Sequence, residues 1–327
     1  MTPPPQPPAP SPAEQRAAAV PADSERGGAG RFDGNVSQSP TERLVHGLLA
    51  ACALVTVATT LGIVGVLVWE TVGFFRQVPL AEFFGRAEWT PLFADGSFGV
   101  WPLVTGTLLI TAIAAVVALP LGLLAAVYVS QYADARVRRV VKPALELLAG
   151  VPTVVFGYFA LTAVTPFLQT FVPDLGVYNA LSAGLIVGVM ILPLVASLSE
   201  DALRSVPSRL AEGAYALGAT KGEVVWRVVL PAALSGVVAS FILALSRAVG
   251  ETMIVVLAAG ATPQLTLDVR ESVQTMTAFI VSATTGDAAQ GTAVFQSLFA
   301  VGLLLFLMTL AMNVLAQRVV RRYGEGA

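Results

Sequence analysis

Six long apolar segments constrain this chain more than any other feature of its sequence. They cover approximately residues 45–69, 103–129, 144–171, 180–199, 233–261 and 293–316. A membrane-spanning helix needs about 20 mostly apolar residues. Only 12% of the residues are charged, whereas a soluble domain has about 25%. We therefore predict an all-α integral membrane protein with six transmembrane helices.

Several of these segments contain proline, which a helix tolerates poorly. Pro120 lies in the second, Pro152 and Pro166 in the third, and Pro193 in the fourth. Breaks of this kind persist in membranes where neighbouring helices or a cavity satisfy the freed backbone groups. The pattern favours a bundle around a pathway over six independent anchors.

The positive charges lie mostly on one side of the predicted spans. The N-terminal tail, the loop after the second span, the loop after the fourth and the C-terminus hold 15 of the 19 Lys and Arg residues. Cytoplasmic loops carry such an excess. We therefore predict that both termini are cytoplasmic and that the spans are in contact with lipid.

The two ends differ in composition from the spans. Residues 1–42 are rich in Pro and Ala and have no apolar core typical of a signal peptide, so we predict a disordered cytoplasmic tail. Residues 43–322 form the predicted six-helix domain, and 323–327 a short C-terminal tail. With one cysteine, Cys52, and one histidine, His46, the sequence predicts no disulfide and no metal site. Its net charge of −2 does not indicate a nucleic-acid partner.

The loop of residues 200–232 has the signals of two short helices. Ser208 follows a proline and is a plausible N-cap, Gly218 is a natural helix stop, and a second helix is expected to begin near Lys221. One interpretation is an amphipathic connector that rests on lipid headgroups.

The spacing in this loop also resembles the coupling loop of ABC importer permeases. That pattern is Glu-Ala-Ala, three residues, Gly, nine residues, then Ile-x-Leu-Pro. Here it reads Glu212-Gly213-Ala214, YAL, Gly218, ATKGEVVWR, then VVLP with Leu230 and Pro231. Gly213 and Val228 depart from the pattern. The resemblance implies the type I permease architecture, with residues 207–231 docking into a cleft of a cytoplasmic ATPase.

The chain has no phosphate-binding loop of the form G-x-x-x-x-G-K-[ST]. We therefore predict that it is not an enzyme, has no catalytic residues and binds no cofactor itself. A partner ATPase would bind ATP and Mg²⁺. Six spans with one coupling loop would form half of a pore made by two permeases.

The apolar segment LALSRAVGETMIVVLAAG, residues 243–260, contains two opposite charges, Arg247 and Glu251. Such residues cost about 2.5–3.5 kcal/mol each near the bilayer centre, and they persist where they face an interior or a pathway. At positions i and i+4 of a continuous helix they share one face. One interpretation is a structural ion pair that neutralises itself.

The other interpretation is an anion pathway. A guanidinium suits a tetrahedral oxyanion, and a neighbouring carboxylate repels a fully ionised anion but accepts a hydrogen bond from a protonated one. Phosphate at neutral pH keeps a proton and sulfate does not, so the pair is a possible phosphate-over-sulfate filter.

Longer stretches resemble phosphate importer permeases of the PstC type. They include SRAVGETMIV, FGVWPLVTGTLLIT, KPALELLAGVPTVVFG and TMTAFIVSATTGD, within residues 45–322. The resemblance implies a multi-pass protein of a bacterial plasma (inner) membrane, with phosphate passage at Arg247 and Glu251. It also implies a PstA-like second permease, a dimeric PstB-like ATPase and an extracytoplasmic PstS-like binding protein. The alternatives are a permease for phosphonate or sulfate, and a non-transporting subunit that tethers an ATPase. The outer loops, residues 70–102 and 262–292, either dock the binding protein or merely cap the bundle.

Overall fold

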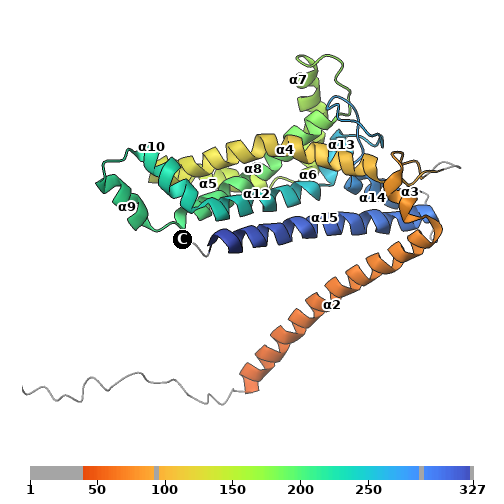
Figure 1. Cartoon of the computed structure of the whole chain (residues 1–327), viewed down its shortest axis with the longest axis horizontal. Coiled ribbons are helices and arrows are strands. Elements are labelled where there is room, and N and C mark those ends of the chain that lie inside the picture. The colour runs from red at the N-terminus through yellow and green to blue at the C-terminus, as the bar shows by residue number, and fades with distance from the viewer. Residues whose placement is uncertain (1–39, 92–95, 287–290, 325–327) are drawn as a thin grey trace, which may run out of the picture. The chain divides into compact units, whose positions relative to one another are not determined.

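The computed structural model describes residues 40–91, 96–286 and 291–324, and its regular structure there is helical apart from a single antiparallel bridge between Trp89 and Phe98. Figure 1 shows the arrangement. In chain order the elements are α2 (Pro40–Gln77), α3 (Leu80–Gly85), α4 (Trp101–Val127), η2 (Tyr128–Tyr132), α5 (Ala135–Ala149), α6 (Thr153–Phe159), η3 (Ala160–Val164), α7 (Thr165–Gln169), α8 (Ala180–Arg204), α9 (Ser208–Ala216), α10 (Lys221–Val224), η4 (Val225–Val229), α11 (Leu230–Ala232), α12 (Leu234–Val249), α13 (Met253–Ala258), α14 (Met276–Thr285) and α15 (Ala293–Gly324). The η elements are single π-helical turns.

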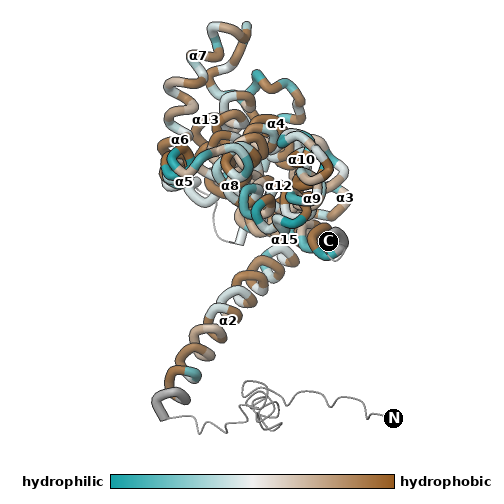
Figure 2. The backbone as a smooth tube through the Cα atoms, turned by 90° about the vertical axis from the view of Figure 1, so that its left-hand side faces the viewer, coloured by the Kyte–Doolittle hydropathy of each residue, from teal (hydrophilic) through white to brown (hydrophobic). Residues whose placement is uncertain are grey.

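The chain divides into two compact units, and the boundary between Leu61 and Gly62 falls inside α2. In the first unit, all side chains from Leu44 to Leu61 are exposed. Figure 2 shows that α2 is hydrophobic along most of its length. A helix that is apolar all round requires an apolar environment. The predicted disorder of residues 1–42 and the short tail 323–327 fall largely outside the described residues and stay predictions.

Among the described residues, four helices are long and apolar enough to cross a membrane: Leu44–Gln77, Trp101–Tyr132, Ala180–Arg204 and Ala293–Arg321. Two bent helix pairs bring the number to six if each pair is one span. The six predicted segments overlap these helices and pairs, and the prediction of six spans agrees with the upper end of the range from four to six. Their boundaries and continuity differ in two places.

The third predicted span, residues 144–171, is not one helix. Its first part belongs to α5, which begins earlier, at Ala135, where the Asp134 side chain accepts a hydrogen bond from the Val137 amide at 2.8 Å. The axis then turns by 87° between α5 and the α6–α7 segment. Pro152 explains the turn, because proline has no amide hydrogen and disfavours helical backbone at the residue before it. The charged residues before residue 144, predicted as a loop, are helical.

The fifth predicted span, residues 233–261, is also interrupted. The chain bends by 70° at its start, between the Lys221–Ala232 segment and α12. Helix α12 then ends at Val249, inside the predicted span. Gly250, Glu251 and Thr252 lie between α12 and α13. The expectation that Arg247 and Glu251 share a face of one continuous helix is therefore wrong. Gly250 has low helix propensity, and the Glu251 side chain competes for backbone donors.

In the second unit, α8 is the central helix and α4 packs along it. Two glycines one turn apart make this close packing possible. A Cβ on Gly184 would lie 2.6 Å from Ile113 Cβ, and one on Gly188 would lie 3.1 Å from the Ala114 carbonyl oxygen. Small residues at such spacing are typical of membrane helix interfaces. Helix α12 packs against α8 and α15.

Helix α14 lies within the TMTAFIVSATTGD stretch. Its first amide, that of Met276, donates to Thr107 Oγ1 of α4 at 3.0 Å. Phe279 of α14 meets Trp89 edge-to-face at 4.8 Å between ring centroids. These contacts anchor α14 at the N-terminal end of α4.

Candidate functional site

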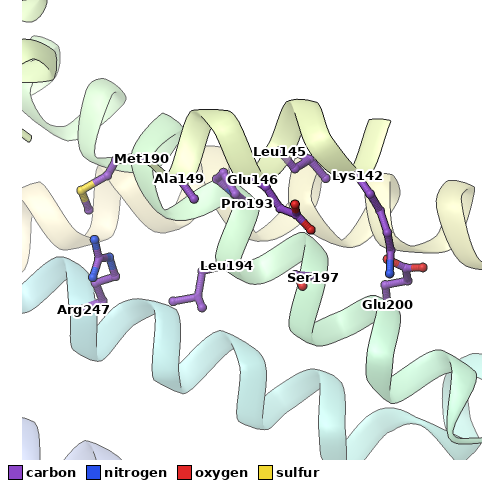
Figure 3. A pocket seen from close by; sticks show the side chains of 10 residues that line it. All are labelled: Lys142, Leu145, Glu146, Ala149, Met190, Pro193, Leu194, Ser197, Glu200 and Arg247. Atoms are coloured by element: carbon purple, nitrogen blue, oxygen red, sulfur yellow. The ribbon is translucent and has the colours of Figure 1, made fainter. Parts of the chain in front are cut away.

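A cavity of about 400 Å³ lies between α5, α8 and the end of α12. Figure 3 shows Arg247 at one end of it and Lys142 with Glu200 at the other. Its lining residues recur at helical spacing, so one face of α5 and one face of α8 form its walls. They are Lys142, Leu145, Glu146 and Ala149 from α5, Met190, Pro193, Leu194, Ser197 and Glu200 from α8, and Arg247 from α12.

Arg247 lies in the last turn of α12, and its side chain reaches the cavity. It makes no hydrogen bond or ion pair with any residue that the structure describes, and it is exposed within the chain. A guanidinium carries five N–H donors and cannot lose its charge in a protein. The end of α12 therefore presents an unpaired cation with free donors to the cavity.

Glu251 lies in a different environment. The residue is only 8% exposed. Its Oε1 accepts hydrogen bonds from the amides of Met253 at 3.2 Å and Ile254 at 3.4 Å. These are the first amides of α13, which have no partner within the helix. Glu251 is not among the residues that line the cavity and forms no ion pair with Arg247. In this structure its carboxylate stabilises the start of α13.

Glu200 is the buried charge at the other end of the cavity, with its side chain 4% exposed. Oε2 lies 3.2 Å from Lys142 Nζ of α5, and Oε1 lies 3.0 Å from Arg204 Nε one turn further along α8. The Arg204 contact is an ion pair without hydrogen-bond alignment. A buried carboxylate is costly unless it is paired, so this network holds α5 against α8.

Glu146 adds a carboxylate between the two ends of the cavity (Figure 3). It is exposed and forms no ion pair with a described residue. An anion in this cavity thus meets two cations, Arg247 and Lys142, and a carboxylate that favours a protonated oxyanion over a fully ionised one. Sequence reasoning expected such a carboxylate at Glu251.

Sequence reasoning did not identify Lys142, Glu146 and Glu200 as candidates. Two signals pointed to them. Lys142 and Glu146 are four residues apart in KPALELLAG, and Glu200 directly follows a long apolar segment. Recognising α5 as an amphipathic helix would have placed the first two on one face.

The predicted coupling loop contains the expected two helices. Helix α9 begins at Ser208 with Pro207 at the N-cap position, so Ser208 is the first helical residue and not the cap. Ala211 and Ala214 pack against a buried cluster that includes Leu203, Val224 and Val225. Glu212 and Gly213 are exposed, and Figure 2 shows hydrophilic residues along α9.

Gly218 ends this helix as predicted, with φ of +87°, a conformation that favours glycine. The preceding Leu217 is 91% exposed. Thr220 and Glu223 then form a capping box at the start of α10. A large apolar side chain held outside the bundle by a rigid turn is suited to contact with another surface.

Leu230 and Pro231 lie elsewhere, in α11 at the bend before α12. The π-helical turn η4 (Val225–Val229) precedes them, and Pro231 has no amide to donate. The six residues predicted for ATPase coupling therefore divide into four on α9 and its turn, of which all but Ala214 are exposed, and a pair at the bend.

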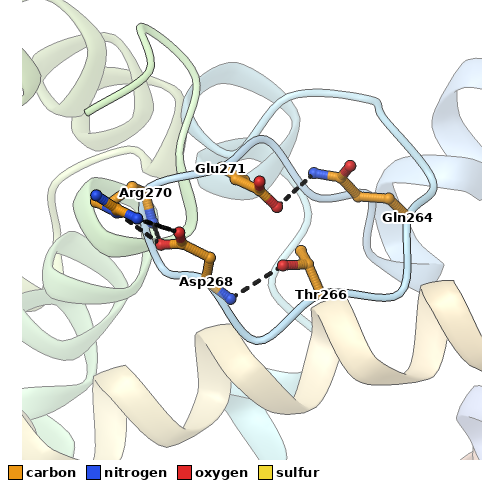
Figure 4. Close-up of polar contacts among 5 residues, drawn as sticks. All are labelled: Gln264, Thr266, Asp268, Arg270 and Glu271. Carbon is orange, nitrogen blue, oxygen red and sulfur yellow. Dashed lines mark hydrogen bonds and ion pairs between the residues drawn. The ribbon is translucent and has the colours of Figure 1, made fainter. Parts of the chain in front are cut away.

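The loop after α13 is ordered by polar contacts (Figure 4). Arg270 forms a bidentate ion pair with Asp268, with Nη2 2.6 Å from Oδ2. The hydrogen bond and charge of Arg270 lower the pKa of Asp268 to about 2. Gln264 Nε2 donates to Glu271 Oε2 at 3.1 Å. In the described parts of the chain, no three His, Cys, Asp or Glu residues are placed to hold a metal ion.

Residues 118–324 match the family described as binding-protein-dependent transport system inner membrane component. The chain is 32% identical over 264 residues to the probable ABC transporter permease protein YqgH of Bacillus subtilis, covering 80% of this chain and 85% of that one. It is 32% identical over 270 residues to the phosphate transport system permease protein PstC of Xylella fastidiosa, covering 76% of this chain and 81% of that one.

The phosphate transport system permease protein PstA 1 of Mycobacterium tuberculosis is 37% identical over 172 residues, 52% of this chain and 54% of that one. Among solved structures, a bacterial ABC transporter that imports the polysaccharide alginate matches 84% of this chain and 95% of its own, with a TM-score of 0.60 and 16% identity. That likeness shows the permease fold.

Proposed function

Because this chain belongs to the family of inner-membrane components of binding-protein-dependent transport systems, we propose that it is a permease subunit of an ATP-driven phosphate importer. It is a multi-pass membrane protein that forms half of the pathway for inorganic phosphate. The similarity to PstC proteins over about three quarters of the chain supports phosphate as the cargo.

The observation that carries the proposal is Arg247. An unpaired guanidinium within an apolar membrane segment is costly unless it has a ligand, and this one reaches a cavity between α5 and α8. Phosphate offers several oxygens to a planar fork of donors. A protonated phosphate oxygen can also donate a hydrogen bond to a carboxylate, and Glu146 lines the same cavity.

Energy comes from a partner ATPase that binds ATP and Mg²⁺. Helix α9 and the Gly218 turn dock on it, with Glu212, Gly213 and Leu217 at the surface. Ala211 and Ala214 fix α9 to the bundle, so a rigid-body movement of the ATPase reaches α12 through the bend at Leu230 and Pro231. In this proposal α9, α10 and both termini lie in the cytoplasm, in agreement with the distribution of Lys and Arg along the sequence.

Three partners complete the importer. The second permease is PstA-like, the ATPase is a PstB-like dimer, and an external binding protein of the PstS type delivers phosphate. The loop with the Asp268–Arg270 ion pair is a suitable docking point for the binding protein, because its charged residues are exposed at the end of the bundle away from α9.

Uptake by the complete complex in liposomes tests the proposal. We expect ATP-dependent accumulation of ³²P-phosphate that tenfold excess sulfate or phosphonate does not reduce. Uptake of labelled sulfate or phosphonate in place of phosphate would identify a different oxyanion importer. ATP hydrolysis without uptake of any of the three would identify a tethering subunit.

A graded series at Gly213 tests the docking of α9. A Cβ on Gly213 meets nothing within 4 Å in this chain, so Gly213→Ala is expected to fold and couple normally. Gly213→Trp and Glu212→Arg are expected to lower phosphate-stimulated ATP hydrolysis about tenfold, because they alter the contact surface. Normal coupling by Gly213→Trp in an assembled complex would contradict the docking of this face.

A further inference from the structure

Lys142 lines two hollows of the structure at the same time. One is the cavity that contains Arg247. The other is an open groove of about 510 Å³ nearer the start of α5, and its charged lining residues are all cations. We call it the basic groove, and its charged residues are Arg138, Arg139, Lys142 and Arg204. The pair of Lys142 and Glu200 therefore stands between the cavity and the basic groove.

The two cations hold different oxygens of Glu200. Lys142 Nζ lies 3.2 Å from Oε2, and Arg204 Nε lies 3.0 Å from Oε1. Arg204 belongs to α8, as Glu200 does, whereas Lys142 comes from α5. Lys142 can leave Glu200 without leaving the buried carboxylate unpaired, because Arg204 stays with it. A lone buried carboxylate would be costly.

The remaining cations of the basic groove are not paired with carboxylates in the described structure. Arg138 donates to the Val129 carbonyl at 2.9 Å, and Arg139 donates to the Ala135 carbonyl at 3.2 Å. Carbonyl acceptors do not neutralise a positive charge, so the groove stays attractive to anions. Cationic side chains therefore follow one another from Arg247 in the cavity, past Lys142, to the basic groove.

We propose that Lys142 is a second anion-binding site at the end of the cavity opposite Arg247. A passing oxyanion replaces Glu200 as the ion-pair partner of Lys142. The ammonium group has three donors and exchanges partners easily. While no anion is present, Glu200 holds Lys142 and closes this end of the cavity. Once the anion has moved into the basic groove, the ion pair re-forms. The inference rests on the proposed phosphate function.

The competing explanation is that Lys142 and Glu200 only hold α5 to α8. The two explanations differ for a charge swap. In Lys142→Glu with Glu200→Lys, an ion pair between the helices is retained, although Arg204 then lies one turn from a lysine on α8. The cation at position 142 is lost, however, and a carboxylate takes its place at the cavity.

The experiment measures ³²P-phosphate uptake, ATP hydrolysis and thermal unfolding of the full complex in liposomes or detergent. Lys142→Gln is expected to lower phosphate uptake per ATP hydrolysed at least tenfold, with a small decrease in the midpoint of unfolding because Arg204 still pairs with Glu200. Lys142→Arg keeps the cation and is expected to retain at least a third of the uptake. Arg136→Gln is the matched control, because it removes a cation from an exposed position of the same helix outside both hollows.

The charge swap is expected to assemble but to stay at least tenfold lower in uptake. Recovery of uptake by the swap, or normal uptake by Lys142→Gln, would overturn the proposed site. If the swap does not assemble, the difference in phosphate uptake between Lys142→Gln and Lys142→Arg distinguishes the anion site from a purely structural ion pair. A wild-type complex that moves another oxyanion but no phosphate would overturn the proposed function and this inference together, whereas wild-type uptake with unaffected Lys142 variants would overturn only the inference.

Discussion

The two ends of the cavity handle charge in opposite ways. At one end Arg247 has no partner among the described residues, and at the other Glu200 is held by two cations, Lys142 and Arg204. An unpaired charge in a bundle depends on a ligand, whereas a paired one depends on the protein around it. Substitutions at the first end should therefore change transport alone, and those at the second should also change stability.

The largest expected effect is that of Arg247→Ala. Losing two charge-assisted hydrogen bonds of about 1.5–3 kcal/mol each should lower phosphate uptake by at least about 100-fold. Because no described residue loses a partner, the midpoint of thermal unfolding should move by less than about 2 °C. Arg247→Lys keeps the charge and loses the planar fork, so its phosphate uptake should lie between those of the wild type and Arg247→Ala. A variant that fails to assemble would show that Arg247 is structural and would remove the contrast between the two ends.

A double-mutant cycle on the cations around Glu200 tests the other end. Lys142→Gln or Arg204→Gln alone should cost about 1 kcal/mol of unfolding free energy, because the remaining cation still pairs with Glu200. Together they should cost more than the sum, about 3 kcal/mol or more, since the carboxylate is then buried without a cation. Thermal unfolding of the assembled complex measures this. Strictly additive effects would mean that the two cations do not share Glu200.

Glu146 lies between the two ends, and its expected effect is on selectivity. Glu146→Gln removes the carboxylate that repels a fully ionised anion, so sulfate should compete with phosphate about tenfold better. Phosphate uptake itself should change less than about threefold. Competition measurements with labelled phosphate give both values. Unaltered exclusion of sulfate would place the discrimination elsewhere, at Glu251 or in the binding protein.

The smallest expected effect concerns an ion pair outside the bundle, Asp268 with Arg270. Its exposed geometry contrasts with the buried Glu200. The pKa of Asp268 is lowered from 3.8 to about 2, so its stabilising contribution is complete above pH 4 and is lost as the pH falls through about 2. Pepsin cleavage of this loop should accelerate only below about pH 3. In Arg270→Gln the acceleration should begin nearer pH 4, and an identical pH profile would contradict the role of this pair.

The sequence predicted some features well because their causes are local. Apolar segment length predicted where the long apolar helices lie, and a glycine at a helix end predicted the turn at Gly218, where φ is +87°. It failed where a local rule was applied across a break. Arg247 and Glu251 were placed on one helix face, but α12 ends at Val249 and the Glu251 carboxylate accepts hydrogen bonds from the first amides of α13.

By itself the sequence determined an all-helical membrane protein with a cation inside its fifth apolar segment, because hydrophobicity and helix formation depend on composition and short-range spacing. Only the tertiary structure decided which charges meet. Lys142 and Glu200 come together because α5 turns by 87° at Pro152 and packs antiparallel to α8. An ion pair between distant segments depends on that packing, which no local pattern encodes, and the same packing leaves Arg247 unpaired at the cavity.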